Sequence, residues 1–137
     1  MELWIKNDSH NELTVELFPK NEYVINYNLY RSSDHKNSLR SLRRFKVLTK
    51  RDEALFSSVN LDQMPYDLID KIFDSIFLNI NETTLKFSRE KVIGYSENLF
   101  TDDSNWEYEV RYHDHIGWNS AESHVFSFVI TEAKLKQ

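Results

Sequence analysis

Three histidines in the last quarter of the sequence have the residue types and the spacing that could do chemistry. His113 and His115 flank Asp114, and His124 follows across a short predicted hairpin. In a His-x-His pair at a strand end both side chains point the same way, and imidazole is a common zinc ligand and a common general base. The segment therefore raises two possibilities, a transition-metal site and a hydrolase.

A nuclease or other hydrolase would need a carboxylate to hold a metal or to orient the imidazole of His113 or His115. The candidates are Asp102, Asp103 and Glu107, but no spacing among these residues is specific. The sequence has no Gly-rich phosphate loop, no serine in a nucleophile elbow, no His-Glu-x-x-His motif and no cysteine. We therefore interpret the histidine segment as a polar strand end and turn. The expected protein is not an enzyme and has no catalytic residue, metal or cofactor.

Two predicted strands would position these residues. Residues 106–113 alternate large apolar side chains with charged ones, and we expect Trp106 and Tyr108 to be buried. Residues 124–131 place apolar groups on both faces, which is typical of a central strand or of a strand whose outer face meets a partner.

Other segments have helical periodicity. Behind Pro65, apolar side chains in residues 65–78 recur at i, i+1, i+4 and i+5, which predicts a buried helix that forms the main core element. Residues 36–46 place an apolar side opposite a basic one, which predicts an amphipathic basic helix. Its apolar side consists of Leu39, Leu42 and Phe45, and its basic side of Lys36, Arg40, Arg43 and Arg44. A short helical turn is expected within residues 51–59.

The remaining patterned segments alternate with period two. Residues 3–6, 12–18 and 22–30 predict a three-stranded antiparallel meander, and residues 84–88 and 91–96 predict a hairpin. The order is β-β-β-α-α-β-β-β-β, which predicts an α+β fold with a mostly antiparallel sheet packed with one buried helix and one basic amphipathic helix. With 40% hydrophobic residues, two glycines and two prolines in 137 residues, we expect a single globular domain over residues 1–137.

Charge is distributed unevenly along the chain. Residues 31–51 contain eight basic residues and one acid, a net of +7, so a chain total of −5 leaves −12 on the other 116 residues. The basic segment could track nucleic-acid phosphates, lie on an anionic membrane, or be a solvated face that pairs with acids elsewhere. We favour the third interpretation, because the core needs its apolar side and the acidic remainder repels phosphate. Neither a membrane nor nucleic acid is an expected partner.

Carboxylates interleaved with tyrosine and tryptophan form the more informative surface. Aromatic anchors give affinity for a protein partner, and carboxylates steer its approach. The candidate partner-binding residues are Glu107, Glu109, Asp114, Trp118, Asp102 and Asp103.

A small, acidic, cysteine-free α+β domain that has no catalytic motif and is rich in Asn, Asp, Ser and aromatic residues resembles the bacterial immunity proteins. These neutralise polymorphic or contact-dependent growth inhibition toxins. The resemblance implies a cytoplasmic, stoichiometric inhibitor that covers the active or substrate-binding surface of one cognate toxin domain, often a nuclease. It is one of class and assigns no binding residue. The sequence shows no export signal and no apolar run of membrane-spanning length, which agrees with a cytoplasmic protein.

Three alternatives remain open at this point. A phage-type inhibitor would share the acidic character. A small regulatory nucleic-acid-binding protein would use Arg40, Arg43 and Arg44, and a metal-dependent hydrolase would use His113, His115 and His124.

Overall fold

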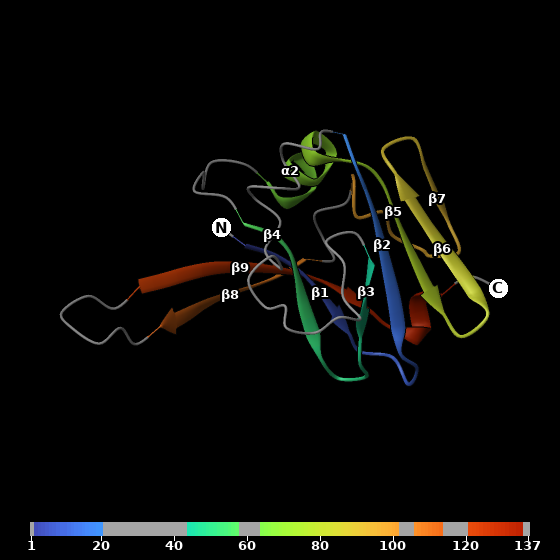
Figure 1. Cartoon of the computed structure of the whole chain (residues 1–137), viewed down its shortest axis with the longest axis horizontal. Helices are drawn as coiled ribbons and strands as arrows, with labels where there is room; N and C mark the ends of the chain where they lie inside the picture. Colours follow the sequence, from blue (N-terminus) through green and yellow to red (C-terminus); the bar gives the residue numbers. More distant parts are fainter. Residues whose placement is uncertain (1, 21–43, 58–63, 102–105, 114–120, 136–137) are drawn as a thin grey trace.

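The structure is a computed structural model that describes residues 2–20, 44–57, 64–101, 106–113 and 121–135 (Figure 1). These residues are mostly strand, with one α-helix and one short 3-10 helix among them. The described part therefore agrees with an α+β class in which most strand pairs are antiparallel. No helix within the described ranges is long and apolar enough to cross a membrane.

One sheet has four strands in the order β4-β1-β9-β8 and is called sheet A. Its strands are β1 (Glu2–Asn7), β4 (Asp52–Ser57), β8 (Trp106–His113) and β9 (Ala121–Ile130). β1 is antiparallel to β4 but parallel to β9, and β8 is antiparallel to β9. The two-sided apolar pattern of residues 124–131 predicted a central strand, and the position of β9 between β1 and β8 confirms it.

The other sheet has five strands in the order β3-β2-β5-β6-β7, all antiparallel, and is called sheet B. Its strands are β2 (Leu13–Pro19), β3 (Arg44–Val47), β5 (Phe73–Ile80), β6 (Thr83–Ser88) and β7 (Lys91–Ile93). The predicted hairpin around residues 88–91 is confirmed as β6 and β7. The predicted N-terminal meander is wrong, because β1 and β2 lie in different sheets. Its third member, residues 22–30, lies outside the described residues.

The predicted helix over residues 65–78 is half right. Helix α2 (Pro65–Ile72) ends at Ile72, and β5 begins at the next residue. Within β5, Ile76, Leu78 and Ile80 are buried while the residues between them are partly exposed, so the period has changed to two. The helical projection failed because Ile76 and Phe77, which would lie on one side of a helix, occupy opposite faces of this strand.

The predicted basic helix over residues 36–46 is contradicted where the structure describes it. Arg44 and Lys46 are exposed, and Phe45 and Val47 are buried, so charged and apolar residues alternate along β3. Residues 36–43 lie outside the described residues. The short helical turn expected within 51–59 is also wrong, since residues 52–57 form β4.

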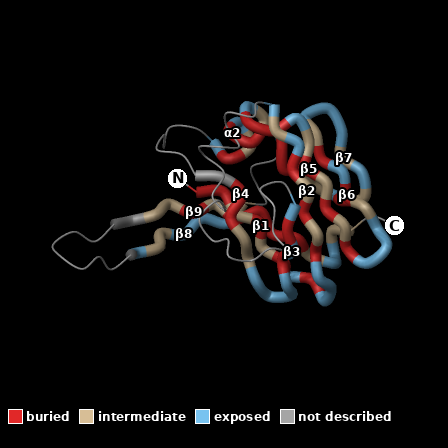
Figure 2. Tube along the Cα trace, viewed as in Figure 1, coloured by how far each residue is buried: buried red, intermediate tan, exposed pale blue. Residues whose placement is uncertain are grey.

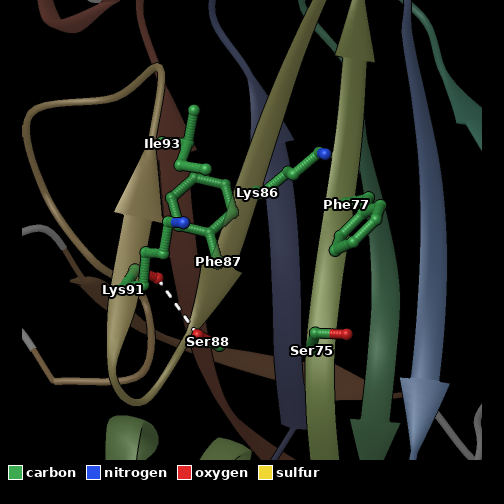
Figure 3. Close-up of a pocket in the computed structure, with 7 residues that line it drawn as sticks. All are labelled: Ser75, Phe77, Lys86, Phe87, Ser88, Lys91 and Ile93. Atoms are coloured by element: carbon green, nitrogen blue, oxygen red, sulfur yellow. Dashed lines mark hydrogen bonds between the residues drawn. The ribbon is translucent and has the colours of Figure 1, made fainter.

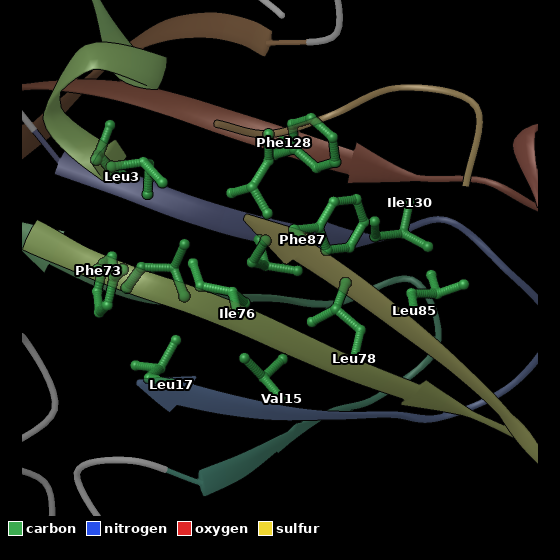
Figure 4. Close-up of a cluster of buried hydrophobic side chains, with 14 of the residues drawn as sticks. Leu3, Val15, Leu17, Phe73, Ile76, Leu78, Leu85, Phe87, Phe128 and Ile130 are labelled. Atoms are coloured by element: carbon green, nitrogen blue, oxygen red, sulfur yellow. The ribbon is translucent and has the colours of Figure 1, made fainter. Parts of the chain in front are cut away.

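The buried side chains of the two sheets meet in one hydrophobic cluster (Figures 2 and 4). Phe128 of sheet A lies between rings from elsewhere in the chain, with centroid distances of 6.0 Å to Phe87 and 6.1 Å to Tyr95. The Tyr95 hydroxyl donates a hydrogen bond to the Val129 carbonyl at 3.0 Å and accepts one from the Thr131 amide at 3.1 Å. Helix α2 adds Leu68, Ile69 and Ile72 to the same cluster.

Candidate protein-binding surface

The β8–β9 hairpin extends away from the rest of the molecule, as Figure 1 shows. Its strands pair in continuous register from Trp106 opposite Phe128 to His113 opposite Ala121. Among the described strands β8 pairs with β9 alone, so β8 is the edge strand of sheet A in the described part of the chain. A projecting edge strand is accessible to another protein.

One face of this hairpin is aromatic along most of its described length. Because residues opposite each other share a face, Trp106, Tyr108 and Val110 lie beside Phe128, Phe126 and His124, respectively. The Trp106 and Phe128 rings are 5.3 Å apart at the edge of the core. Further out, Tyr108 lies 4.9 Å from the Phe126 ring and stacks on His124 at 5.9 Å. The aromatic face therefore starts in the core and continues beyond it.

The outer part of this face is open. Tyr108 is 54% exposed and Tyr112 is 70% exposed, two of the largest exposures among the apolar and aromatic side chains that the structure describes. The Tyr108 hydroxyl and His124 Nδ1 are 2.6 Å apart, so a hydrogen bond joins the two side chains across the hairpin. We call Tyr108, Tyr112, Phe126 and His124 the hairpin patch.

The carboxylates of β8 lie on the opposite face and pair with cations. Glu107 contacts Lys6 Nζ at 3.4 Å. Glu109 accepts hydrogen bonds from Arg111 at 2.6 and 2.9 Å, and Arg111 also donates to Asp52 at 2.8 Å. Burial lowers the pKa of the Arg111 guanidinium, but its hydrogen bonds to Asp52 and Glu109 outweigh that effect and leave the pKa above its usual value.

Arg111 is held further by an aromatic ring. Its guanidinium carbon lies 4.4 Å from the centroid of Trp4 in β1. Trp4 belongs to β1 and Asp52 to β4, so the contacts of Arg111 connect the edge strand β8 to the two strands on the far side of β9. The Glu109 carboxylate is thus part of a structural network as well as a surface charge.

The structure places two of the six predicted partner-binding residues. Glu107 and Glu109 are exposed as expected, although both form ion pairs. Asp102, Asp103, Asp114 and Trp118 lie outside the described residues. Tyr108 was expected to be buried beside Trp106, and that expectation is wrong. The signal for an exposed patch was present, because the apolar alternation runs through Tyr112, further than the core reaches.

The structure describes only part of the candidate histidine cluster. His124 pairs with Val110, three residues along β8 from His113. Its Nδ1 atom is engaged by Tyr108, and His115 lies outside the described residues. Within the described part of the chain no three His, Asp or Glu residues are grouped so that they could hold a metal.

Two lysines of the basic segment pair with acids in the described part of the chain. Lys46 lies 3.3 Å from Glu12, and Lys50 lies 2.9 Å from Asp8. Both acids come from outside the basic window, so these two contacts agree with the intramolecular pairing that the sequence favoured for the segment.

Comparisons with protein-family models, with curated proteins and with solved structures found no match to this chain.

Proposed function

We propose that this chain is a stoichiometric protein-binding inhibitor of the immunity type, and that it binds a cognate toxin domain through the hairpin patch. The observation that carries the proposal is the exposure of Tyr108 and Tyr112 on a hairpin whose aromatic face is otherwise packed. Exposed tyrosines held on a rigid strand are typical hot-spot residues of protein interfaces, since they bury large area at a small cost in side-chain entropy.

The edge of β8 supports the same surface. A partner strand could add to sheet A at this edge while the tyrosines occupy pockets on that partner. Backbone pairing would supply affinity, and the alternate side chains of β8 would supply specificity. Because the sequence contains no cysteine, the interaction would not involve a disulfide bond from this chain.

Charge favours a basic partner. The chain carries −5 overall, and Glu107 and Glu109 lie beside the hairpin patch on the other face of β8. Because both carboxylates form exposed ion pairs, we assign them to steering of the encounter and not to affinity. A nuclease toxin, which must present a basic surface to its substrate, fits this charge.

Co-expression with a toxin domain encoded next to this chain tests the proposal. The variant Tyr108→Ala with Tyr112→Ala should fold, lose growth rescue and dissociate from the toxin at least 100-fold faster, since two hot-spot side chains are removed. The matched control is Leu48→Ala with Met64→Ala, which removes two exposed apolar side chains outside the hairpin. Full rescue by the tyrosine variant would place the interface elsewhere, and no binding to any neighbouring toxin would remove the immunity proposal.

A second variant separates steering from affinity. Glu107→Lys with Glu109→Lys should slow association about tenfold at low salt and change dissociation little. An effect confined to dissociation would show that these carboxylates contact the partner directly.

A further inference from the structure

The outer face of sheet B differs in character from the rest of this acidic molecule. One register row crosses all five strands as Arg44, Glu16, Phe77, Lys86 and Ile93. The neighbouring rows add mostly small polar side chains and further lysines. They contain Thr14, Phe18, Lys46, Ser75, Asn79, Thr84, Ser88 and Lys91.

Aromatic rings occupy the centre of this face. The Phe18 and Phe77 rings are 4.9 Å apart, and Lys86 Nζ lies 5.4 Å from the centroid of the Phe77 ring. Phe18 is 36% exposed and Ile93 is 39% exposed, so the apolar groups are accessible. Figure 3 shows Lys86 between Phe77 and Ile93, with all three on the same side of the sheet.

A hollow of about 290 Å³ lies against these residues. Its lining includes Lys86 and Lys91 as cations and Ser75 and Ser88 as hydroxyl groups, beside the Phe77 ring. Among the described residues the outer rows of sheet B contain four cations, Arg44, Lys46, Lys86 and Lys91, and one carboxylate, Glu16. Lys46 pairs with Glu12 at 3.3 Å, so the positive charge beside the hollow comes from Lys86 and Lys91. The hollow thus combines positive charge, hydrogen-bond donors and an aromatic surface.

We propose that this face of sheet B binds single-stranded nucleic acid. Lysines contact phosphates, and exposed aromatic rings on an open sheet stack with unpaired bases, which is how many single-strand-binding folds work. An acidic peptide would satisfy the lysines but would leave the exposed Phe18 ring, which rests on Phe77, without a stacking partner. A duplex would also fail to use the rings, because its bases are already stacked on one another.

The acidic remainder of the chain does not prevent such binding at physiological salt. Screening reduces the effect of exposed charges beyond about 8 Å at 0.15 M ionic strength. Packed sheets are already about 10 Å apart, so the carboxylates on the outer face of sheet A are further than that from the outer face of sheet B. The sequence argument against nucleic acid concerned the basic segment of residues 31–51 and the net charge. Sheet B takes Arg44 and Lys46 from that segment, but Lys86 and Lys91 come from β6 and β7, outside it.

Fluorescence anisotropy with labelled 12-nucleotide oligo-dT and oligo-U tests the proposal. We expect dissociation constants of about 10⁻⁵ M or tighter at 50 mM salt, and binding at least fivefold weaker to a duplex of the same length, because stacking with each base contributes about that factor or more. The variant Lys86→Ala with Lys91→Ala should reduce the slope of log affinity against log salt by about 1.4, since each phosphate contact on a single strand contributes about 0.7. Phe18→Ala should weaken binding and leave that slope unchanged.

The matched control is Lys6→Ala with Lys71→Ala, two lysines outside this face, which should change neither affinity nor slope. A labelled poly-glutamate peptide provides the other comparison. The proposal would be overturned if the wild-type protein bound the peptide or the duplex as tightly as the single strand. It would also be overturned if the double-lysine variant bound the single strand as tightly as the wild type does. None of these results bears on the hairpin patch, so the two proposals fail separately.

Discussion

Asn7 is a fully buried polar side chain that joins four segments of the chain. Its Nδ2 atom donates hydrogen bonds to the carbonyls of Asn11 at 2.7 Å and Val47 at 3.0 Å. Its Oδ1 atom accepts from the amide and the hydroxyl of Ser9. Its backbone amide donates a hydrogen bond to the Arg51 carbonyl, and its backbone carbonyl accepts one from the Lys50 amide. The end of β1 is thereby fixed to the start of β2 and to the β3–β4 turn.

We predict that Asn7→Ala lowers the free energy of unfolding by about 2 to 3 kcal/mol, because it leaves buried donors and acceptors without partners. Denaturant unfolding measures this loss. Asn11→Ala is the matched control, since Asn11 contributes its backbone carbonyl to the network, and its effect should stay within about 0.5 kcal/mol. Equal effects of the two substitutions would contradict the role given to the Asn7 side chain.

A second prediction at the residue scale concerns acid. The hydrogen bond from Lys50 and its charge lower the pKa of the exposed Asp8 carboxyl. Because this pKa is lower in the folded than in the unfolded chain, the contribution of the pair to stability is present above the unfolded pKa and is lost as pH falls through the folded one. An NMR titration should show the Asp8 pKa rising towards its ordinary value in Lys50→Gln. An unchanged titration would mean that the pair does not form in solution.

Single residues also show what the sequence could and could not predict about the surface. The alternation in residues 106–113 correctly predicted strand β8 and the exposure of Glu107 and Glu109. It could not tell Trp106, which lies at the core, from Tyr108, which lies beyond it. Both residues are aromatic and lie on the same face of β8. They differ because the hydrophobic cluster extends as far as Trp106 and does not reach Tyr108.

At the scale of elements, the junction between α2 and β5 explains the main error in the predicted fold. Apolar residues at i, i+1, i+4 and i+5 fit one face of a helix, but an adjacent apolar pair such as Ile76 and Phe77 also fits a strand, where the two side chains lie on opposite faces. The Phe73 amide donates to the Ile69 carbonyl, and the Lys20 amide donates to the Ile72 carbonyl at 2.8 Å. The second bond comes from a residue 52 positions earlier, so no local pattern could have revealed where the helix ends.

We predict that Phe73→Ala, at the first residue of β5, lowers the free energy of unfolding by about 3 to 5 kcal/mol, because it removes a fully buried ring and leaves a cavity. The exposed neighbour Asp74→Ala should change it by about 0.5 kcal/mol or less. Thermal and denaturant unfolding of the two variants measure the difference. Similar losses would place Phe73 outside the core.

At the scale of the whole molecule, the two sheets share one hydrophobic cluster. Phe128 from sheet A contacts Phe87 from sheet B, so neither sheet buries its inner face without the other. We predict that the slowest-exchanging amides of β1 and β9 and those of β5 and β6 open with the same free energy in native-state hydrogen exchange. Phe128→Ala should lower protection in both sheets by the same amount. Two separate stability classes would instead show that the chain holds two independent units.

The parallel pairing of β1 with β9 has a consequence for the order in which the protein folds. Leu3 pairs with Phe126, so β1 meets a partner strand that is synthesised more than a hundred residues later. Until then β4 is the one described strand with which β1 can pair, and Ile5 lacks Phe128 beside it. Sheet B, whose described strands end at Ile93, is complete much earlier in synthesis. Closing so long a loop is slow, so we expect the nascent chain to hold sheet B first and to expose the apolar edge of β1 to chaperones until β9 arrives.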